Sequence, residues 1–349
     1  MRAVVIHAPK DLRIDNYPDT EPGPGEVRVK IANGGICGSD LHYYHHGGFG
    51  VVRIQQPMAL GHEIAGVVAA IGDGVTGVKA GTRVAVNPSK PCGKCLHCQE
   101  GMRNQCLDMR FLGSAMRFPH VQGGFREFIT VDATQAVPIS DKLSLAEAAV
   151  AEPLAVCLHA GKQAGPLLGK RVLITGCGPI GALMILVSRF GGASEIVVTD
   201  VADAPLAVAQ KLGATHAINA ASEDVVEGVR RLTGGRGADV VLEAAGSPRA
   251  FRLTSEAVRP GGEVIWLGKT DVAEDVAFRW GSLMQEKRIR RSSYGGARPL
   301  RDFPMLARAA LDGRLNLGDL ITARISLEQV NEGFAALKRG EAIRSVVVF

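Results

Sequence analysis

One stretch near the N-terminus carries side chains that together suit a metal ion. They are Cys37, Ser39, His42 and the adjacent pair His62 and Glu63. Thiolate, imidazole and carboxylate are donors that bind zinc and leave room for an open coordination position. A zinc ion with an open position can bind an alcohol oxygen and make it more acidic, as it does for water. The same residues also admit a purely structural interpretation, with Cys37 as a buried apolar side chain and His62 as a core histidine.

A second group of metal-binding side chains lies in a short loop. It contains Cys92, Cys95, Cys98 and Cys106, at spacings of three, three and eight residues. Four thiolates this close together can close a tetrahedral zinc shell with no vacancy, which is typical of a structural site. His97 lies inside the loop, but Cys106 already completes a set of four. An iron–sulfur cluster also takes four thiolates and is the competing interpretation; a redox pair or a chance cluster is the remaining one.

A glycine-rich motif follows an apolar strand at 171–175 and precedes a helix at 182–191. Its glycines are Gly176, Gly178 and Gly181, and the next predicted strand ends in Asp200, nineteen residues beyond Gly181. This context of strand, glycines, helix and acidic residue is typical of a dinucleotide-binding site.

Each position in that motif has a physical role. Gly176 permits a tight turn, Gly178 lets the backbone approach a pyrophosphate, and Gly181 allows the helix to pack on the strand. The N-terminus of the helix faces the phosphates. Asp200 would bind ribose hydroxyls and repel a 2′-phosphate, and no arginine follows within the next few residues, so the sequence favours NAD over NADP.

Glu152 stands within an apolar helical pattern that covers 143–164. A carboxylate in such a setting requires a partner, because burial without one is costly. Contact with a metal, or with a metal-bound water, is the interpretation we favour. The alternative is a partly exposed glutamate where Pro153 breaks the helix.

The elements that must position these residues fall into two regions. Short apolar runs at 3–8, 26–32, 64–75, 82–86 and 125–132 predict strands of a largely antiparallel, barrel-like domain. From 171 to 268 predicted strands alternate with helices, including a helix over 251–262, which indicates a parallel sheet covered on both faces. The predicted class is α/β, and the tail is expected to return to the first domain. The expected boundaries are 1–152 with 295–349, and 153–294.

Length and composition limit the remaining possibilities. With 349 residues, 46% hydrophobic and 21% charged, the chain is expected to fold into about two globular domains. The net charge of +5 comes from scattered residues, so no nucleic-acid partner is expected. Neither a secretory signal nor an apolar run of membrane-spanning length is visible, and we expect a cytoplasmic protein with no membrane partner. In a reducing compartment its seven cysteines favour metal binding over disulfides.

Taken together, the motifs resemble the zinc-dependent medium-chain dehydrogenase/reductase family, in particular its polyol, sorbitol dehydrogenase-like branch. The resemblance runs through nearly the whole chain, and five segments carry it: GGICGSDLHYY, GHEIAG, the four-cysteine loop, AEPLAVCLHA, and GCGPIG with Asp200. It implies a GroES-like catalytic domain beside a Rossmann domain with a doubly wound parallel sheet. It also implies one catalytic zinc, one structural zinc, NAD, and a homo-oligomer, either a tetramer or a dimer.

The resemblance assigns roles to single residues. Cys37, His62 and Glu63 would bind the catalytic zinc, and Glu152 falls at the remaining ligand position, where it would contact zinc directly or through water. Ser39 would take the substrate proton and pass it through the nicotinamide ribose toward His42. The residues implied near the cofactor are Gly176, Gly178, Pro179, Ile180, Gly181, Asp200, Leu267, Ser293 and Tyr294. Two departures from the sorbitol pattern are visible, Pro205 in place of an arginine and no Arg-Tyr pair in RRSSYGG.

The activity implied is transfer of a hydride to NAD from a secondary alcohol of a small polyol or sugar acid. The segment CGSDLHYYHHGGFG resembles that of sugar-acid dehydrogenases, so L-idonate, oxidised to 5-keto-gluconate, is the specific expectation. Candidate partners for a sugar-acid carboxylate are Arg117, Arg126, Arg298, His45 and His46. Alternatives are a xylitol-, sorbitol- or threonine-type dehydrogenase. From another class, a zinc protein that senses NAD remains, although Ser39 and His42 would give a sensor a proton relay it does not need.

Overall fold

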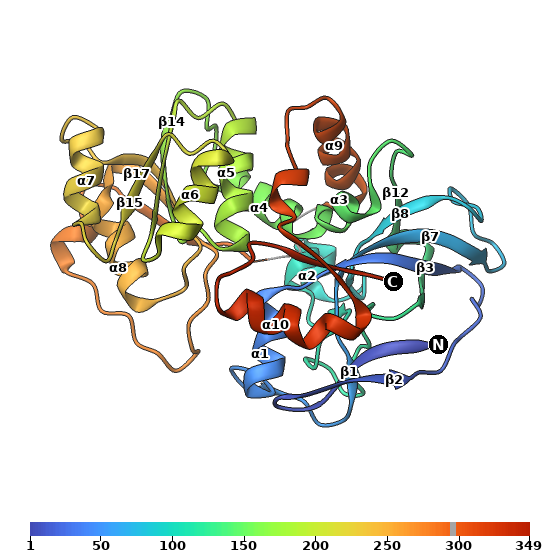
Figure 1. The fold of residues 1–349 in the computed structure, drawn as a ribbon. Helices are drawn as coiled ribbons and strands as arrows, with labels where there is room; N and C mark the ends of the chain where they lie inside the picture. Colours follow the sequence, from blue (N-terminus) through green and yellow to red (C-terminus); the bar gives the residue numbers. More distant parts are fainter. Residues whose placement is uncertain (294–297) are drawn as a thin grey trace. The chain divides into compact units, whose positions relative to one another are not determined.

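The computed structural model describes residues 1–293 and 298–349. The chain forms two compact units, one of Met1–Ala155 with Gly295–Phe349 and one of Val156–Tyr294. Both termini belong to the first unit (Figure 1).

The first unit is built on a seven-stranded sheet with the order β12-β8-β7-β3-β20-β19, in which β11 also pairs with β3. Its strands are β3 (Glu26–Gly35), β7 (Glu63–Ile71), β8 (Arg83–Val86), β11 (Phe128–Asp132), β12 (Ala136–Pro138), β19 (Ala323–Ser326) and β20 (Ser345–Val348). All pairs are antiparallel except β19 with β20. Smaller sheets contain β1 (Arg2–Ala8), β2 (Asp11–Asn16), β4 (Gly48–Phe49), β5 (Val52–Arg53), β6 (Met58–Ala59), β9 (Ser89–Lys90) and β10 (Arg110–Phe111).

The C-terminal strand β20 lies beside β3 in this sheet (Figure 1). In β3, Val27, Val29 and Ile31 alternate toward a buried core, as expected of a strand with one buried face. Gly35 pairs with Glu63 of β7 on one side and with Val346 of β20 on the other. Residues near the beginning and at the end of the chain therefore meet across three neighbouring strands.

The helices that accompany this sheet are α1 (Gly38–His46), α2 (Leu96–Gln99), α3 (Leu145–Ala149), α9 (Pro299–Leu311) and α10 (Val330–Lys338), and α4 (Ala151–Gln163) crosses the boundary between the units. The helical pattern at 143–164 is thus two helices that meet at Val150. Pro153 lies in the first turn of α4, where its missing N–H costs no helical hydrogen bond. The alternative interpretation, a partly exposed Glu152 where Pro153 breaks the helix, is wrong, because Glu152 is 5% exposed and the helix continues through Pro153.

The second unit contains six parallel strands in the order β15-β14-β13-β16-β17-β18. They are β13 (Arg171–Thr175), β14 (Glu195–Asp200), β15 (His216–Asn219), β16 (Ala238–Glu243), β17 (Val258–Trp266) and β18 (Arg288–Arg291). The helices are α5 (Pro179–Phe190), α6 (Asp203–Lys211), α7 (Val225–Leu232) and α8 (Pro248–Ala257). Helix α5 packs beside α6 and α7 beside α8, with the sheet between the two pairs (Figure 1). The predicted doubly wound Rossmann sheet is confirmed.

One boundary in this unit differs from the prediction. The helix expected over 251–262 ends at Ala257, and residues from Val258 onward already belong to β17. Pro260 lacks a backbone N–H and disfavours helical backbone at Arg259, so the helix cannot continue through these residues.

Short 3-10 turns complete the structure: η1 (Arg103–Gln105), η2 (Ala133–Gln135), η3 (Trp280–Leu283), η4 (Gly318–Leu320) and η5 (Leu327–Gln329). Within residues 1–293 and 298–349, every helix is too short or too polar to cross a bilayer.

Candidate active site

Cys37, His62 and Glu63 come together in the first unit. One ligand atom from each lies within 4.8 Å of the others, and His62 and Glu63 are buried. Cys37 directly precedes α1, and Glu63 begins β7. Gly35 must lack a side chain here, because a Cβ on it would collide with the Glu63 carboxylate.

The charges in this cluster favour a divalent cation. Burial raises the pKa of the Cys37 thiol to about 12, and the nearby carboxylates of Glu63 and Asp40 add to the increase. Burial also raises the pKa of Glu152 well above its usual value, an effect that the His62 imidazole opposes. Glu63 Oε1 is buried and has no hydrogen-bond partner among the residues that the structure describes. A sulfur, a nitrogen and a free carboxylate oxygen in an excess of buried acidic groups fit a zinc ion.

Glu152 is buried and close enough to couple electrostatically to His62, Glu63 and Cys37. It is outside the group whose ligand atoms all lie within 4.8 Å of one another. This placement suits contact through a water molecule better than a fourth direct bond.

Both ring nitrogens of His62 have polar neighbours. Nδ1 lies 3.7 Å from Asp40 Oδ1, and Nε2 lies 3.4 Å from Ser39 Oγ. The second distance is long for a hydrogen bond, so Nε2 is available to a metal. Asp40 is fully buried, and its other oxygen accepts a 3.0 Å hydrogen bond from the Cys37 backbone N–H. At 3.7 Å the Asp40 carboxylate makes no hydrogen bond with Nδ1, and it faces the far side of the His62 ring as an electrostatic partner.

Asp40 was not among the predicted site residues. The sequence held a signal for it, because an acidic residue three positions after Cys37 is typical of the first turn of a helix.

Arg344 is the second residue that sequence reasoning missed. Its Nη1 donates to Glu63 Oε2, and both side chains are buried. The two residues are 281 positions apart, so no local pattern could have paired them.

Ser39 and His42 lie on α1, three residues apart and therefore on neighbouring positions of one helix face. Ser39 is half-buried and near His62, whereas His42 is exposed. The helix thus leads from the buried cluster toward solvent.

The four cysteines of the loop also converge. Their sulfur atoms all lie within 4.8 Å of one another. Backbone N–H groups donate hydrogen bonds to two of these sulfurs. Cys92 N donates to Cys106 Sγ at 3.2 Å, and Cys95 N donates to Cys92 Sγ at 3.4 Å. A backbone hydrogen bond from Leu107 lowers the pKa of Cys95 to about 6, while burial raises the pKa of Cys98 to about 12. Four converging sulfurs with donated N–H groups fit a closed tetrahedral zinc shell. His97 is outside the group.

In the second unit a cavity of about 420 Å³ is lined by Gly176, Gly178 and Asp200. Gly176 has φ +86°, and a Cβ on it would lie 2.8 Å from Ala245 N, so only glycine fits the turn. A Cβ on Gly181 would collide with the Gly176 carbonyl. Gly178 has no atom within 4 Å of its Cβ position, which leaves open space for a close ligand.

Asp200 ends β14 at the edge of this cavity. Its Oδ2 accepts a hydrogen bond of 2.8 Å from Cys177 N, and its Oδ1 accepts bonds from Val201 N and Ala202 N. Oδ2 keeps a lone pair for a ribose hydroxyl, whereas the two hydrogen bonds to Oδ1 use both of its lone pairs.

The other predicted cofactor residues follow strands or begin a helix. Pro179 and Ile180 form the first turn of α5, Leu267 follows β17, and Ser293 follows β18 at the same carboxyl edge of the sheet. Ligands bind at this edge in open parallel sheets. Tyr294 lies outside the described residues.

Glu243, which was not predicted, holds two loops at that edge. Its Oε1 accepts hydrogen bonds from Ala245 N at 2.8 Å and Gly246 N at 2.7 Å. Burial raises the pKa of this carboxyl. A Cβ on Gly268 would collide with Glu243 Oε2, so the loop after β17 also lies against it.

Comparison with protein families gives two matches. Residues 23–141 match the alcohol dehydrogenase GroES-like domain, and residues 179–311 match the zinc-binding dehydrogenase domain.

Several characterised proteins are similar over most of the chain. Sorbitol dehydrogenase of Bacillus subtilis is 36% identical over 335 residues, which cover 95% of this chain and 92% of that protein. L-Idonate 5-dehydrogenase (NAD(P)(+)) of Escherichia coli is 44% identical over 241 residues, or 69% of this chain and 68% of that protein. The crystal structure of L-idonate 5-dehydrogenase from Escherichia coli matches with a TM-score of 0.90 at 36% identity, over 100% of this chain and 98% of that one.

Proposed function

This chain belongs to the zinc-dependent medium-chain dehydrogenases, and we propose that it oxidises a secondary alcohol of a sugar acid, with L-idonate as the substrate and NAD as the hydride acceptor. Membership makes it an oxidoreductase of the polyol and sugar-acid class that uses zinc and a nicotinamide cofactor. The observation that carries the proposed chemistry is the buried sulfur, nitrogen and oxygen cluster of Cys37, His62 and Glu63.

In the proposed site Cys37, His62 and Glu63 would hold the catalytic zinc, and Glu152 would contact it through a water molecule. Bound zinc acts as a Lewis acid that lowers the pKa of a substrate hydroxyl. Asp40 faces the His62 ring at Nδ1, and Arg344 holds the Glu63 carboxylate in place. The four cysteines of the loop hold the structural zinc.

Ser39 is the proposed proton acceptor from the substrate hydroxyl. It is half-buried beside His62, and His42 lies three residues further along the same helix at the surface. An imidazole titrates near neutral pH, so His42 can pass the proton to solvent.

For the cofactor, the proposed contacts are the N-terminus of α5 and Gly178 with the pyrophosphate, and Asp200 with the adenosine ribose. Leu267, Ser293 and Tyr294 are proposed near the nicotinamide half. Glu243 supports these contacts because it accepts hydrogen bonds from the backbone N–H groups of Ala245 and Gly246 and so fixes that loop.

The carboxylate of a sugar acid needs a cation. Arg117 pairs with Asp108, and the Arg126 guanidinium lies over the Tyr17 ring, so both have structural partners. Arg298, His45 and His46 are the candidates that we propose. A homo-oligomer, either a tetramer or a dimer, in the cytoplasm completes the proposal; light scattering measures its mass.

The test is NADH formation at 340 nm with L-idonate, gluconate, sorbitol, xylitol and L-threonine, each with NAD and with NADP. Turnover highest on L-idonate is the expected result. Equal turnover on sorbitol or xylitol would replace the sugar-acid assignment by a polyol activity, which the similarity to sorbitol dehydrogenase favours as second candidate. No turnover on any of the five would overturn the proposed function.

A further inference from the structure

The cofactor cavity contains one side chain that the dinucleotide motif does not account for. Arg249 lines the cavity together with Gly176, Gly178 and Asp200. It is the second residue of α8, and it is 49 positions beyond Asp200 in the sequence. Arg249 is the only basic residue among those that line this cavity in the described part of the chain.

A short chain of contacts holds Arg249 at the same edge of the sheet as Asp200. Its Nη2 donates to the carbonyl oxygen of Ala220 at 3.3 Å. The backbone N–H of Ala220 in turn donates to the carbonyl oxygen of Asp200 at 2.9 Å. Ala220 itself lines the cavity. The guanidinium is therefore close to the residue expected to bind the adenosine ribose.

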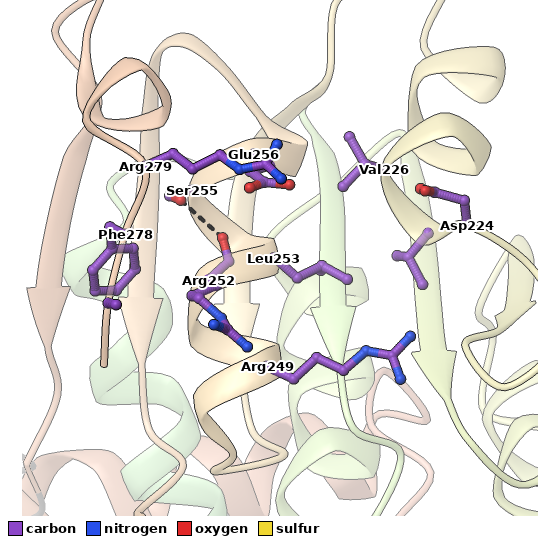
Figure 2. A pocket seen from close by; sticks show the side chains of 11 residues that line it. Asp224, Val226, Arg249, Arg252, Leu253, Ser255, Glu256, Phe278 and Arg279 are labelled. Atoms are coloured by element: carbon purple, nitrogen blue, oxygen red, sulfur yellow. Dashed lines mark hydrogen bonds between the residues drawn. The ribbon is translucent and has the colours of Figure 1, made fainter. Parts of the chain in front are cut away.

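The charge of Arg249 is not matched by a carboxylate in the part of the chain that the structure describes. No carboxylate lies within ion-pair distance of it in the residues that the structure describes, and the side chain is exposed. Figure 2 shows the neighbouring cavity, which Arg249 also lines: its side chain extends from α8 to the side on which Asp224 and Val226 lie, while Phe278 is on the opposite side of α8. Its remaining N–H donors can bind an anion that enters the cavity, and guanidinium binds phosphate especially well.

The Asp200 carboxylate repels a bound anion less strongly than a carboxylate without hydrogen bonds would. Three backbone N–H groups, from Cys177, Val201 and Ala202, already donate to its two oxygens. These bonds spread and partly compensate its negative charge. The cavity thus has a partly compensated carboxylate for a ribose hydroxyl and an uncompensated guanidinium beside it.

We propose that Arg249 binds the 2′-phosphate of NADP, so that the enzyme accepts NADP as well as NAD. This inference rests on the proposed function, since it assumes that the cavity takes the adenosine half of a nicotinamide dinucleotide. No arginine directly follows Asp200, the acidic residue of the dinucleotide motif. Arg249 would instead supply the positive charge from α8.

The test compares two adenosine fragments by calorimetry, 5′-AMP and 2′,5′-ADP, which differ only in the 2′-phosphate. In Arg249→Gln the ratio of the dissociation constants, 2′,5′-ADP over 5′-AMP, should rise about tenfold, the effect of losing one charge-assisted hydrogen bond. Arg249→Lys keeps the charge and should recover most of that loss. Arg252→Gln is the matched control, because Arg252 is on the same helix and lines only the neighbouring cavity (Figure 2); its ratio should equal that of the wild type.

An unchanged ratio in Arg249→Gln, or an equal rise in Arg252→Gln, would overturn the inference while leaving the proposed function intact. A wild-type protein that binds neither 5′-AMP nor NAD would instead remove the dinucleotide site and the proposed function with it. The same variants, assayed for turnover with NADP and with NAD, should show kcat/KM for NADP falling about tenfold relative to that for NAD in Arg249→Gln.

Discussion

Arg344 and Glu63 form an ion pair in which both side chains are almost fully buried, at 2% and 0% exposure. The pairing follows from the sheet, because β20 and β7 lie on either side of β3 and Gly35 pairs with both. One carboxylate oxygen of Glu63 is bound to Arg344, and the other has no hydrogen-bond partner within residues 1–293 and 298–349. The arginine thus fixes a carboxylate that offers its free oxygen to a metal.

Replacing Arg344 by Gln should remove zinc from this site. The buried Glu63 carboxylate would lose its counter-charge, and breaking a buried pair typically costs about 3–5 kcal/mol. Elemental analysis should show the zinc content falling from about two ions per chain to about one, with a lower free energy of unfolding. Arg308→Gln, at a surface pair with Asp312, is the control and should change neither quantity. Full zinc content in Arg344→Gln would show that Glu63 does not depend on the arginine.

Replacing Asp40 by Asn should weaken the hold of His62 on zinc. The amide keeps the size of the side chain but lacks the charge that orients the Nδ1–H. Loss of such a partner typically lowers metal affinity or activity about 10- to 100-fold. Competition with a chromogenic chelator measures the affinity. Asp15→Asn is the control, since Asp15 also pairs with a histidine, His7, but through Nε2 at 2.6 Å and away from the metal-binding residues. Equal affinities in Asp40→Asn and wild type would contradict the role of Asp40.

Thiol reactivity should separate the two cysteine sites once zinc is chelated. The pKa of Cys95 is lowered to about 6, so this thiol ionises above that pH, whereas the pKa of Cys37 is raised to about 12 and it stays protonated at neutral pH. Because the thiolate is the reactive form, iodoacetamide at pH 7.5 should label Cys95 first. Peptide mapping by mass spectrometry measures both rates, and the Cys95 rate should rise with pH around 6. Faster labelling of Cys37 would contradict these assignments, and zinc-loaded protein serves as the protected control.

Replacing Glu243 by Gln should weaken NAD binding. The neutral amide would hold the Ala245 and Gly246 N–H groups less firmly, because hydrogen bonds to a charged acceptor are the stronger ones. The dissociation constant for NAD should rise about tenfold, the effect of one weakened charge-assisted bond. Glu263→Gln is the control on neighbouring β17, where Glu263 pairs with Arg288 instead of supporting a cofactor loop. If both variants bind NAD equally well, the support by Glu243 is not needed.

Local sequence patterns were enough to predict the glycine motif, the four-cysteine loop and the parallel sheet. The spacing of Gly176, Gly178 and Gly181 and of the four cysteines depends on backbone turns that a few neighbouring residues fix, and the parallel sheet followed from alternating apolar strands and helices. Boundaries were less certain from sequence. The apolar runs at 143–164 and 251–262 both have the composition of helices. In the first run the helix is interrupted at Val150, and in the second the helix gives way to a strand at Val258.

Contacts between distant segments required the tertiary structure. Arg344 reaches Glu63 only because β20 pairs with β3, and Arg249 reaches the Asp200 edge only because its side chain extends from α8 to Ala220, the residue after β15. The sequence around either arginine resembles that of an ordinary surface charge. Whether an arginine is a solvated surface group or the partner of a buried carboxylate depends on strand register and helix packing, and these bring together residues that no local spacing relates.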